Sequence, residues 1–298
     1  GNPGFKLTIP LLDLSLKALV LGDLLLTLSL RIRPYERVAG TTNEMLHKWV
    51  ERLKEMLLRR KLNIRDTIDE IIKDFELIDS DLWDIKPKVG VVGEILVKFH
   101  PDANNDVIGV IEREGGEAVM PGLIDFLLYC FYNSNFKSSV LGKSPINAFF
   151  SNIAIHIIEK YRRCMKESLK KRPQFAPYAP SHISELADSA KKIIQLGNTT
   201  GEGWFLTAEM LELLHANVPN IVCVQPFACL PNHVTGKGMI KELRRLYPQA
   251  NIVPVDYDPG ASEVNQINRI KLMISVAFEN AEKELEDIKK KARTELFR

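Results

Sequence analysis

The sequence predicts an α/β protein in which a helical N-terminal region precedes a parallel sheet. Up to about Asp84, apolar residues recur at steps of three and four, which is the period of amphipathic helices. Residues 86–120 then read as strand, helix and strand within roughly 30 residues, the pattern of a βαβ unit. Strands and helices alternate again from Thr207 onward. Because the two strands of a βαβ unit run in the same direction, we expect a parallel sheet.

The N-terminal region is predicted to contain helices only. Helical spacing appears in two sets of apolar residues, namely Met45, Leu46, Trp49, Val50, Leu53, Met56 and Leu57, and then Ile68, Ile71, Ile72 and Phe75. The apolar run 9–30 contains Asp13, Lys17 and Asp23, and a charge inside a membrane span is costly. We therefore expect a buried helix there rather than a membrane span. The abrupt start of the chain, with nothing like a signal peptide, suggests a fragment of a longer protein.

The predicted sheet begins near Lys86. A short β-branched run ends at Gly93 and Glu94, a helix-like segment follows, and a second short strand covers Glu117 to Met120. Helices are predicted next at 123–131, 145–170 and 181–196, with a proline-rich loop before the last of them. The final third is predicted to contain a helix at 207–216, a strand at 220–225, a helix at 237–247, a strand at 250–257 and a long helix from Asn265.

These elements suggest a helical region at 1–85, a first α/β subdomain with a helical insertion at 86–180, and a second α/β subdomain with a long C-terminal helix at 181–298. In the closing helix the apolar residues keep a spacing of three and four: Ile267, Ile270, Ile274, Ala277, Ala281, Leu285, Ile288 and Ala292. A stripe of that length must be covered, either by the core of the protein or by another subunit.

Composition narrows the class of protein. The formal net charge of +2 is too small to indicate nucleic-acid binding, and no membrane association is expected. The four cysteines are Cys130, Cys164, Cys223 and Cys229, which are scattered and lack a CxxC spacing. A disulfide framework and a structural zinc site are therefore not indicated, and we expect a protein of the reducing cytoplasm.

The first group of candidate site residues follows the first predicted strand. In an open parallel sheet, ligands bind beyond the carboxyl ends of the strands. Glu94 lies at such an end, and Lys98, His100, Asn104 and Asn105 come soon after it, so several polar groups are expected on one loop region. Two readings stay open. The loop can bind a ligand, or Asn104 or Asn105 is simply a helix N-cap and the histidine only ends the strand.

The second group lies in the segment IVCVQPFACLPNHVTGKGMIKELRR, residues 221–245. Its Gly-Lys-Gly turn lacks the first glycine and the hydroxyl residue of a phosphate-binding loop, so we interpret it as a helix entry. Cys229 and His233 are a weak candidate for thiol catalysis because no third orienting group is evident. Cys229 stands between Pro226 and Pro231, where a stiff loop can hold a thiolate over the crevice.

The other three cysteines are weaker candidates for chemistry. Cys223 falls within a predicted strand and is expected in the core, as free cysteine commonly is. Cys164 is expected on a helix. Cys130 is expected either in the core or facing the same crevice as Cys229. Spacing alone therefore does not define an iron–sulfur site.

Several long phrases of the chain resemble one known family. The segments VGEILVKFHPDANND, EGGEAVMPGLIDFLLYCFYN, GEGWFLTAEM and VQPFACLPNHVTGKGMIKELRRLYPQANIVPVDYDPGASEVNQINRIKLM look like the 2-hydroxyacyl-CoA dehydratase superfamily. They are most similar to the dehydratase-like portion of the proteins called CoA-substrate-specific enzyme activases or 2-hydroxyglutaryl-CoA dehydratase activators. The similarity runs from about Leu14 to about Met273 and so covers most of the chain.

The resemblance implies a Rossmann-like architecture of three α/β/α layers, with two such subdomains and a helical region. In the dehydratases a cysteine-ligated [4Fe-4S] cluster takes an electron from an ATP-driven activator and passes it to a 2-hydroxyacyl-CoA, whose ketyl radical loses water. Cys229 and Cys130 match the cysteine-bearing segments, so the resemblance implies that they bind the cluster and its iron. Glu94 and His233 are the candidates for catalytic polar contacts in the cleft.

The chain also departs from the family. Nothing in it resembles the actin-like ATPase module of an activator, and it offers two credible cluster cysteines where a dehydratase subunit usually offers three. A cluster shared across a homodimer or completed by a missing segment would resolve the shortage, and so would having no cluster.

Three functions are therefore compared. The first is a dehydratase-like iron–sulfur electron-transfer module of the dehydratase and activator system, with an ATPase activator module and an acyl-CoA as partners. Whether the chain is itself an enzyme, a lyase, stays open. The alternative is a non-catalytic scaffold that docks the ATPase module without a cluster. A third is a simple acyl-CoA or nucleotide binder that uses Gly201, Gly203 and residues 236–238.

Overall fold

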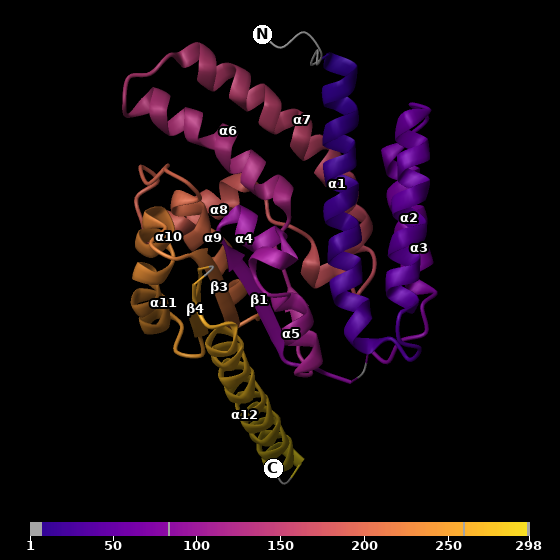
Figure 1. Ribbon diagram of the computed structural model, residues 1–298, viewed down its shortest axis with the longest axis vertical. Coiled ribbons are helices and arrows are strands. Elements are labelled where there is room, and N and C mark those ends of the chain that lie inside the picture. The colour runs from indigo at the N-terminus through magenta and orange to yellow at the C-terminus, as the bar shows by residue number, and fades with distance from the viewer. Residues whose placement is uncertain (1–7, 83, 259, 297–298) are drawn as a thin grey trace. The chain divides into compact units, whose positions relative to one another are not determined.

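The computed structural model describes residues 8–82, 84–258 and 260–296, with side chains as far as Lys283. The chain divides into two compact units, and each unit is built from two separate stretches of sequence (Figure 1). Gly1–Asp84 and Pro121–Ala187 form the helical unit, whereas Ile85–Met120 and Asp188–Arg298 form the α/β unit. The chain thus enters the α/β unit where the sheet is expected to begin, and it leaves that unit again after two strands.

The helical unit contains long helices and short turns. Its described elements are α1 (Ile9–Ile32), a 3₁₀ turn at Arg33–Tyr35, α2 (Thr41–Leu58), α3 (Ile64–Glu76), α6 (Leu123–Ser139), α7 (Pro145–Lys170) and a 3₁₀ turn at Ala176–Tyr178. Helix α1 packs against α2, α3, α6 and α7, and α6 and α7 form a hairpin. Helix α8 (Ile183–Ala190) begins in this unit and ends in the other.

The predicted buried helix at 9–30 is confirmed as α1, whose C-terminal half is largely buried. Asp23, one of the charges in this run, is buried as well. Its carboxylate accepts hydrogen bonds from the backbone N–H groups of Leu123 (3.0 Å) and Ile124 (2.9 Å) at the start of α6. The first N–H groups of a helix have no partner within it, so Asp23 caps α6 from α1. Among the described residues, no helix is long and apolar enough to cross a membrane.

The α/β unit alternates strands with mostly short helices. In chain order its elements are β1 (Lys88–Gly93), α4 (Ile95–Phe99), a 3₁₀ turn at Pro101–Ala103, α5 (Val107–Arg113), β2 (Glu117–Val119), α9 (Gly203–His215), β3 (Asn220–Pro226), α10 (Leu230–Thr235), a 3₁₀ turn at Lys237–Met239, α11 (Ile240–Leu246), β4 (Asn251–Tyr257) and α12 (Glu263–Leu296). The α/β class predicted from the sequence is therefore confirmed.

The four strands form one parallel sheet in the order β2-β1-β3-β4. Strands β1 and β3 are central and almost completely buried, which explains their continuous β-branched sequences. Val92 stands beside Cys223 in this pairing. Buried residues of α9, such as Met210, and of α11, such as Leu243, pack with them into a single apolar core.

This sheet differs from the expected pair of subdomains. Strands β1 and β2 were expected in one subdomain and β3 and β4 in another, but all four lie in one sheet, which is joined by the pairing of β1 with β3. The pattern of apolar residues marks a buried strand but carries no information about which strand will be its neighbour. The helix predicted at 123–131 extends to Ser139, and the one predicted at 181–196 is the shorter α8.

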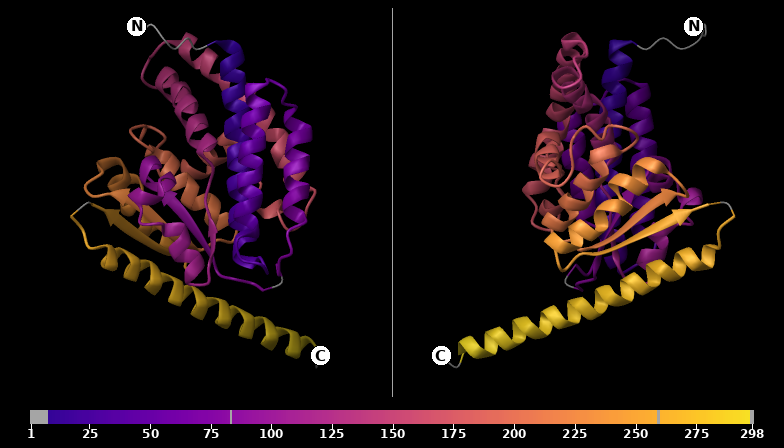
Figure 2. Two further views of the ribbon diagram at one scale, coloured as in Figure 1. Left: turned by 45° about the vertical axis from the view of Figure 1, so that its right-hand side comes forward. Right: turned by 90° about the vertical axis from the view of Figure 1, so that its left-hand side faces the viewer.

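Helix α12 covers part of the sheet with the first part of its apolar stripe. Ile270, Ile274 and Ala277 are buried where α12 packs against β3, β4 and α5. This part of the stripe therefore belongs to the core of the α/β unit. Ala281 is exposed, and Leu285, Ile288 and Ala292 fall outside the described side chains. Figure 2 shows α12, in yellow, running along the sheet and continuing past it.

Candidate functional site

The end of β1 lies directly against β3. Gly93 has a φ of +143°, and a Cβ atom at this position would stand 1.8 Å from the carbonyl oxygen of Val224. A glycine is therefore required for the two strand ends to approach this closely. The next residue, Glu94, donates its N–H to the same carbonyl at 3.0 Å. Its carboxylate Oε2 accepts the N–H of Val97 at 2.9 Å, so Glu94 is the N-cap of α4.

Two buried side chains join this turn to other loops. Glu202, just before α9, accepts the N–H of Ile95 at 3.2 Å through Oε1. The amide of Asn232 in α10, oriented with its nitrogen toward Glu202, donates to Oε2 of that residue at 2.6 Å and accepts the N–H of Glu94 at 2.9 Å. We call Glu94, Glu202, Cys229 and Asn232 the strand-end cluster. It ties the loop after β1 to the loop after β3.

Burial controls the charge state of Glu202. The residue is 4% exposed, and this burial raises the pKa of its carboxyl above the ordinary value. The neighbouring charge of Glu94 raises that pKa further, whereas the hydrogen bond from Ile95 and the charge of Lys98 lower it. The carboxyl of Glu202 is therefore protonated at a higher pH than that of an exposed glutamate.

An ion pair between Lys98 and Glu209 lies nearby in the α/β unit. The ammonium of Lys98, on α4, is 2.7 Å from Oε1 of Glu209, on α9, and both side chains are completely buried. Burial raises the pKa of Glu209 to about 7, and the charge of Lys98 only partly offsets this. The second carboxylate oxygen has no hydrogen-bond partner among the described residues. The pair is therefore a buried charge site with one vacant acceptor.

The thiol of Cys229 lies at the N-terminus of α10 and is half-buried. Burial raises its pKa above the usual value, and a backbone hydrogen bond from Asn232 lowers it in part. The charges of Glu202 and Glu94 raise the pKa again because they oppose a thiolate. The structure thus gives Cys229 acidic neighbours rather than the basic ones that activate a nucleophilic cysteine.

His233 lies one turn further along α10. Its Nδ1 is 2.9 Å from the carbonyl oxygen of Cys229, so Nδ1 carries the proton and Nε2 is the free acceptor in the neutral ring. Nε2 is 3.8 Å from Oδ1 of Asp256 at the end of β4. Asp256 also accepts from Gln225 at 2.6 Å and lies 3.4 Å from the ammonium of Lys237.

Asp256 stays ionised although it is partly buried. Burial by itself would raise its pKa, but the hydrogen bond from Gln225 and the charge of Lys237 outweigh that effect. The pKa of Asp256 therefore lies below its ordinary value. His233 is consequently oriented by a carbonyl on one side and faces a carboxylate on the other. The 3.8 Å between Nε2 and Asp256 exceeds a hydrogen-bond distance, so Asp256 is a charged neighbour of the ring and does not orient it.

The Gly-Lys-Gly turn is a connection between helices. Gly236 ends α10, and Lys237 to Met239 form the 3₁₀ turn that enters α11. A Cβ atom on Gly236 would lie 2.7 Å from a methyl group of Leu206 and 3.2 Å from the sulfur of Cys223. Close packing therefore explains why a glycine stands at this position, and no phosphate-binding role is needed to explain it.

The four cysteines are not gathered at one place in either unit. Cys223 is completely buried in β3, and burial raises the pKa of its thiol to about 12. Cys130 is exposed on α6, and Cys164 is half-buried on α7, both in the helical unit. Among the described residues, no group of three or more His, Cys, Asp or Glu side chains is placed to hold a metal ion. The described part of the α/β unit alone does not fit a complete [4Fe-4S] cluster.

The polar loop after α4 has a largely structural role. Asn104 is buried, donates to the carbonyl of Val97 at 2.6 Å and accepts the N–H of Val107 at 3.0 Å. Asp106 rather than an asparagine is the N-cap of α5. Asn105 donates to Gln266 of α12 at 2.7 Å. His100 is exposed at the end of α4. Of this loop region, only Glu94 and Lys98 take part in the polar network at the strand ends.

Glu202, Glu209, Asn232 and Asp256 were not predicted from the sequence. The sequence could have indicated Glu209, because this residue stands in the apolar stretch WFLTAEMLELL. That stretch lies in α9, whose residues are nearly all buried. When a helix is buried on all sides, an acidic residue in it needs a cation as a partner. Lys98 is that partner. Asn232 carries no comparable signal.

Comparisons with known proteins add no further constraint. No protein-family model, no curated protein and no solved structure was found to match this chain. The resemblance to the dehydratase superfamily therefore stays a prediction.

Proposed function

We propose that the α/β unit is a dehydratase-like binding module whose ligand site is the strand-end cluster. The observation that carries the proposal is the sheet order β2-β1-β3-β4. The chain passes from β1 to β2 on one side and from β3 to β4 on the other, so the strand order reverses between β1 and β3. In open parallel sheets, ligands bind outside the carboxyl ends of the strands at such a reversal. Glu94 and Cys229 follow these two strands.

The surroundings of the cluster support a ligand with both polar and apolar parts. Leu96 of α4, Phe227 directly after β3 and Leu230 of α10 follow the same two strands and are 63%, 67% and 72% exposed. Small-molecule sites commonly combine apolar lining with a few polar groups that fix orientation. An acyl-CoA is the partner that this combination and the resemblance favour. A Rossmann-like fold in three α/β/α layers is the finer form of the same proposal.

Within this proposal Cys229 is a thiolate ligand of a [4Fe-4S] cluster, which would supply one-electron chemistry. The described α/β unit offers one accessible thiol, so further ligands must come from elsewhere. The sources are Cys130 of the helical unit, a second copy of the chain, or a longer form of the protein with its ATPase activator module. Glu94 and His233 then orient polar groups at the strand ends, and the protein works in the cytoplasm.

Iron analysis under anaerobic conditions tests the cluster role. Protein purified without oxygen should contain iron and acid-labile sulfide and show broad visible absorption, which Cys229→Ala should reduce. Cys164→Ala is the matched control, because this half-buried cysteine lies on α7 and should leave the absorption unchanged. A preparation that stays colourless after reconstitution with iron and sulfide would rule out the cluster role for this chain.

The alternative, a docking scaffold without a cluster, is favoured by the outer face of α12. Leu272 and Val276 are 69% and 36% exposed there, whereas Ile274 is buried against the sheet. A charge at Ile274 would damage the fold and could not report on docking. Leu272→Glu is the better variant, with the exposed Asn268→Glu as its control.

Light scattering separates the scaffold from the binding module. If α12 forms an interface between copies, Leu272→Glu should lower the mass in solution and Asn268→Glu should not. An unchanged mass in Leu272→Glu would count against self-association through this face. Reduced mass together with an iron-free preparation would favour the scaffold.

A further inference from the structure

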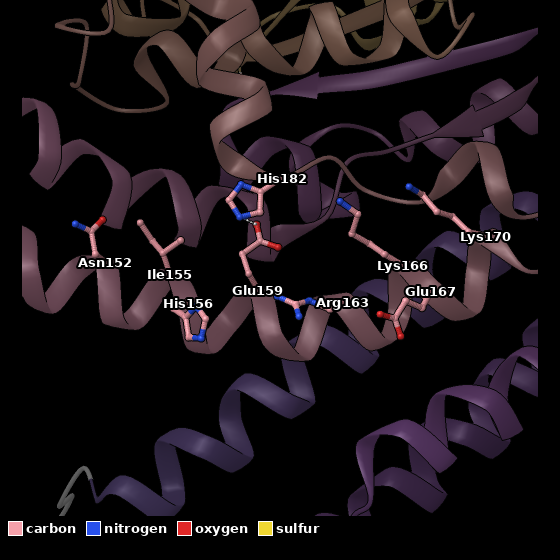
Figure 3. Close-up of a pocket in the computed structure, with 9 residues that line it drawn as sticks. All are labelled: Asn152, Ile155, His156, Glu159, Arg163, Lys166, Glu167, Lys170 and His182. Atoms are coloured by element: carbon pink, nitrogen blue, oxygen red, sulfur yellow. Dashed lines mark ion pairs between the residues drawn. The ribbon is translucent and has the colours of Figure 1, made fainter.

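The helical unit contains a pocket with a volume of about 460 Å³ along one face of α7 (Figure 3). This volume lies within the range of roughly 300–1,000 Å³ that is typical of small-molecule sites. Residues 156, 159, 163, 166 and 170 line it at steps of three and four, so they occupy one face of the helix. His182, just before α8, completes the lining on the same side of the pocket as Lys166 and Lys170.

Cations dominate this pocket. Arg163, Lys166 and Lys170 have no ion-pair partner within the part of the chain that the structure describes. Positively charged side chains that lie one helical turn apart normally repel one another, which costs stability unless a ligand compensates the charge. The three cations span about 10 Å along the helix axis, because an α-helix rises about 1.5 Å per residue.

The acidic residues of the pocket are already bound to other groups. Oε1 of Glu159 is 2.9 Å from the buried guanidinium of Arg162 and accepts the N–H of Ile183 at 3.3 Å. Glu167 pairs with Arg65 of α3 at 3.6 Å. Their charges are therefore partly compensated, and the three cations keep most of their attraction for an anion.

His182 lies beside Glu159 in the lining of this pocket. Its Nδ1 accepts the N–H of Ser184 at 3.2 Å, so the proton of the neutral ring lies on Nε2. Nε2 is 3.8 Å from Oε1 of Glu159 (Figure 3). The imidazole thus presents Nε2 to Glu159, which leaves the binding of an anion to the three cations.

We propose that the pocket along α7 binds a small molecule that carries more than one phosphate group, held by Arg163, Lys166 and Lys170. Phosphate groups carry up to two negative charges and several acceptor oxygens, and both lysine and arginine bind them through charge-assisted hydrogen bonds. Cations spread over two helical turns suit a polyphosphate chain or a ligand with separated phosphates better than a single small carboxylate. This site lies within the helical unit and does not depend on the function proposed for the strand-end cluster.

Calorimetric titration of the 298-residue chain with pyrophosphate, ADP and CoA tests the proposal. At low salt we expect at least one of the three to bind, and binding should weaken as salt is added because Arg163 and Lys170 are exposed. Succinate at the same ionic strength should not compete. Lys166→Gln with Lys170→Gln should weaken binding by roughly tenfold or more for each lysine, as expected for lost charge-assisted hydrogen bonds.

The matched control is Lys160→Gln with Lys171→Gln, which removes the same charge from exposed positions outside the pocket. It should retain binding within roughly twofold, since distant surface charges are screened. Tight binding of pyrophosphate alone would identify the phosphate chain as the recognised group, whereas a clear preference for ADP or CoA would extend the site to the rest of that molecule.

Three results would overturn the proposal. These are failure of all three phosphate compounds to bind, equal weakening in the control variant, and equal competition by succinate. If the double pocket variant proves less stable, Lys170→Gln alone carries the test, because Lys170 is exposed and its loss removes no interaction within the described chain.

Discussion

The two units bury charge in different ways. In the helical unit the guanidinium of Arg162 meets two carboxylates, Asp125 at 2.5 Å and Glu159 at 2.9 Å. In the α/β unit the ammonium of Lys98 is 2.7 Å from Oε1 of Glu209. The other carboxylate oxygen of Glu209 has no hydrogen-bond partner among the described residues. A guanidinium presents five donors in a fixed plane and can satisfy two carboxylates, whereas an ammonium is a compact point charge.

This difference separates a structural ion cluster from a titratable one. The arginine cluster joins α6 to α7 and stabilises the hairpin. Glu209 has a pKa raised to about 7 by burial and lies in the unit that also carries the strand-end cluster. The helical unit thus uses buried charge to hold helices together, and the α/β unit keeps a carboxyl group that changes protonation near neutral pH.

The largest effect should come from the glycine that brings β1 and β3 together. Gly93→Ala places a Cβ atom 1.8 Å from the carbonyl oxygen of Val224, so the strand ends must separate. We expect a loss of more than about 4 kcal/mol in unfolding free energy, measured by urea denaturation. Gly22→Ala, in α1 with no atom within 4 Å of the added carbon, should instead stabilise by about 0.5–1 kcal/mol. Similar effects at the two glycines would contradict this account.

The next largest effect concerns the arginine cluster. Arg162→Met leaves Asp125 and Glu159 buried without their shared cation and should cost about 3–5 kcal/mol in unfolding free energy. Arg163→Met removes the exposed neighbour on the same helix and should change stability by less than about 0.5 kcal/mol. Equal destabilisation of the two variants would contradict the assignment of this cost to the buried carboxylates.

The titration of Glu209 gives a smaller effect that depends on pH. Its pKa is about 7 in the folded protein and near 4.5 in the unfolded chain, so the folded state binds more protons between these values. Stability of the wild type should therefore fall as pH rises from about 4.5 to 7, by no more than about 3 kcal/mol from this group. Glu209→Gln should flatten this slope in denaturation curves recorded across that range. The same flattening in Glu263→Gln, an exposed position on α12, would contradict the assignment.

The smallest of these effects tests the link between the loops. Asn232→Ala removes the donor to Oε2 of the buried Glu202 and one of the two acceptors of the Glu94 N–H, which keeps only its bond to Val224. We expect a loss of about 1–3 kcal/mol in thermal or urea unfolding. Hydrogen exchange at Glu94 should also accelerate, whereas Asn268→Ala at an exposed position should affect neither measurement. Unchanged exchange at Glu94 would argue against the amide bridge.

Local patterns in the sequence predicted most elements of the α/β unit. The strand predicted at 220–225 is found at Asn220–Pro226, and the strand predicted at 250–257 at Asn251–Tyr257. These strands are buried, so their apolar runs are clear. The end of α6 was not predicted, because its last turns carry polar residues such as Asn133, Ser134 and Asn135 and lose the apolar period that marks a helix.

The candidate site was predictable only in part. Glu94 and Cys229 could be placed at strand ends, because both follow apolar runs directly. The bond between Lys98 and Glu209 joins residues 111 positions apart, and no local pattern indicates such a pair. The pairing of β1 with β3 is equally remote in sequence, so the sheet order that brings Glu94 and Cys229 to neighbouring strands required the structure.

The central position of β1 also affects how the protein is made. Its partner β3 lies about 130 residues further along the chain, and at roughly 5–20 residues per second a ribosome needs on the order of 10 s to synthesise that distance. During this interval β1 can pair with β2 alone, and its other edge is left open. An open edge of β-branched residues is a template for pairing with another chain. We therefore expect the nascent chain to depend on chaperones until Pro226 has left the ribosome.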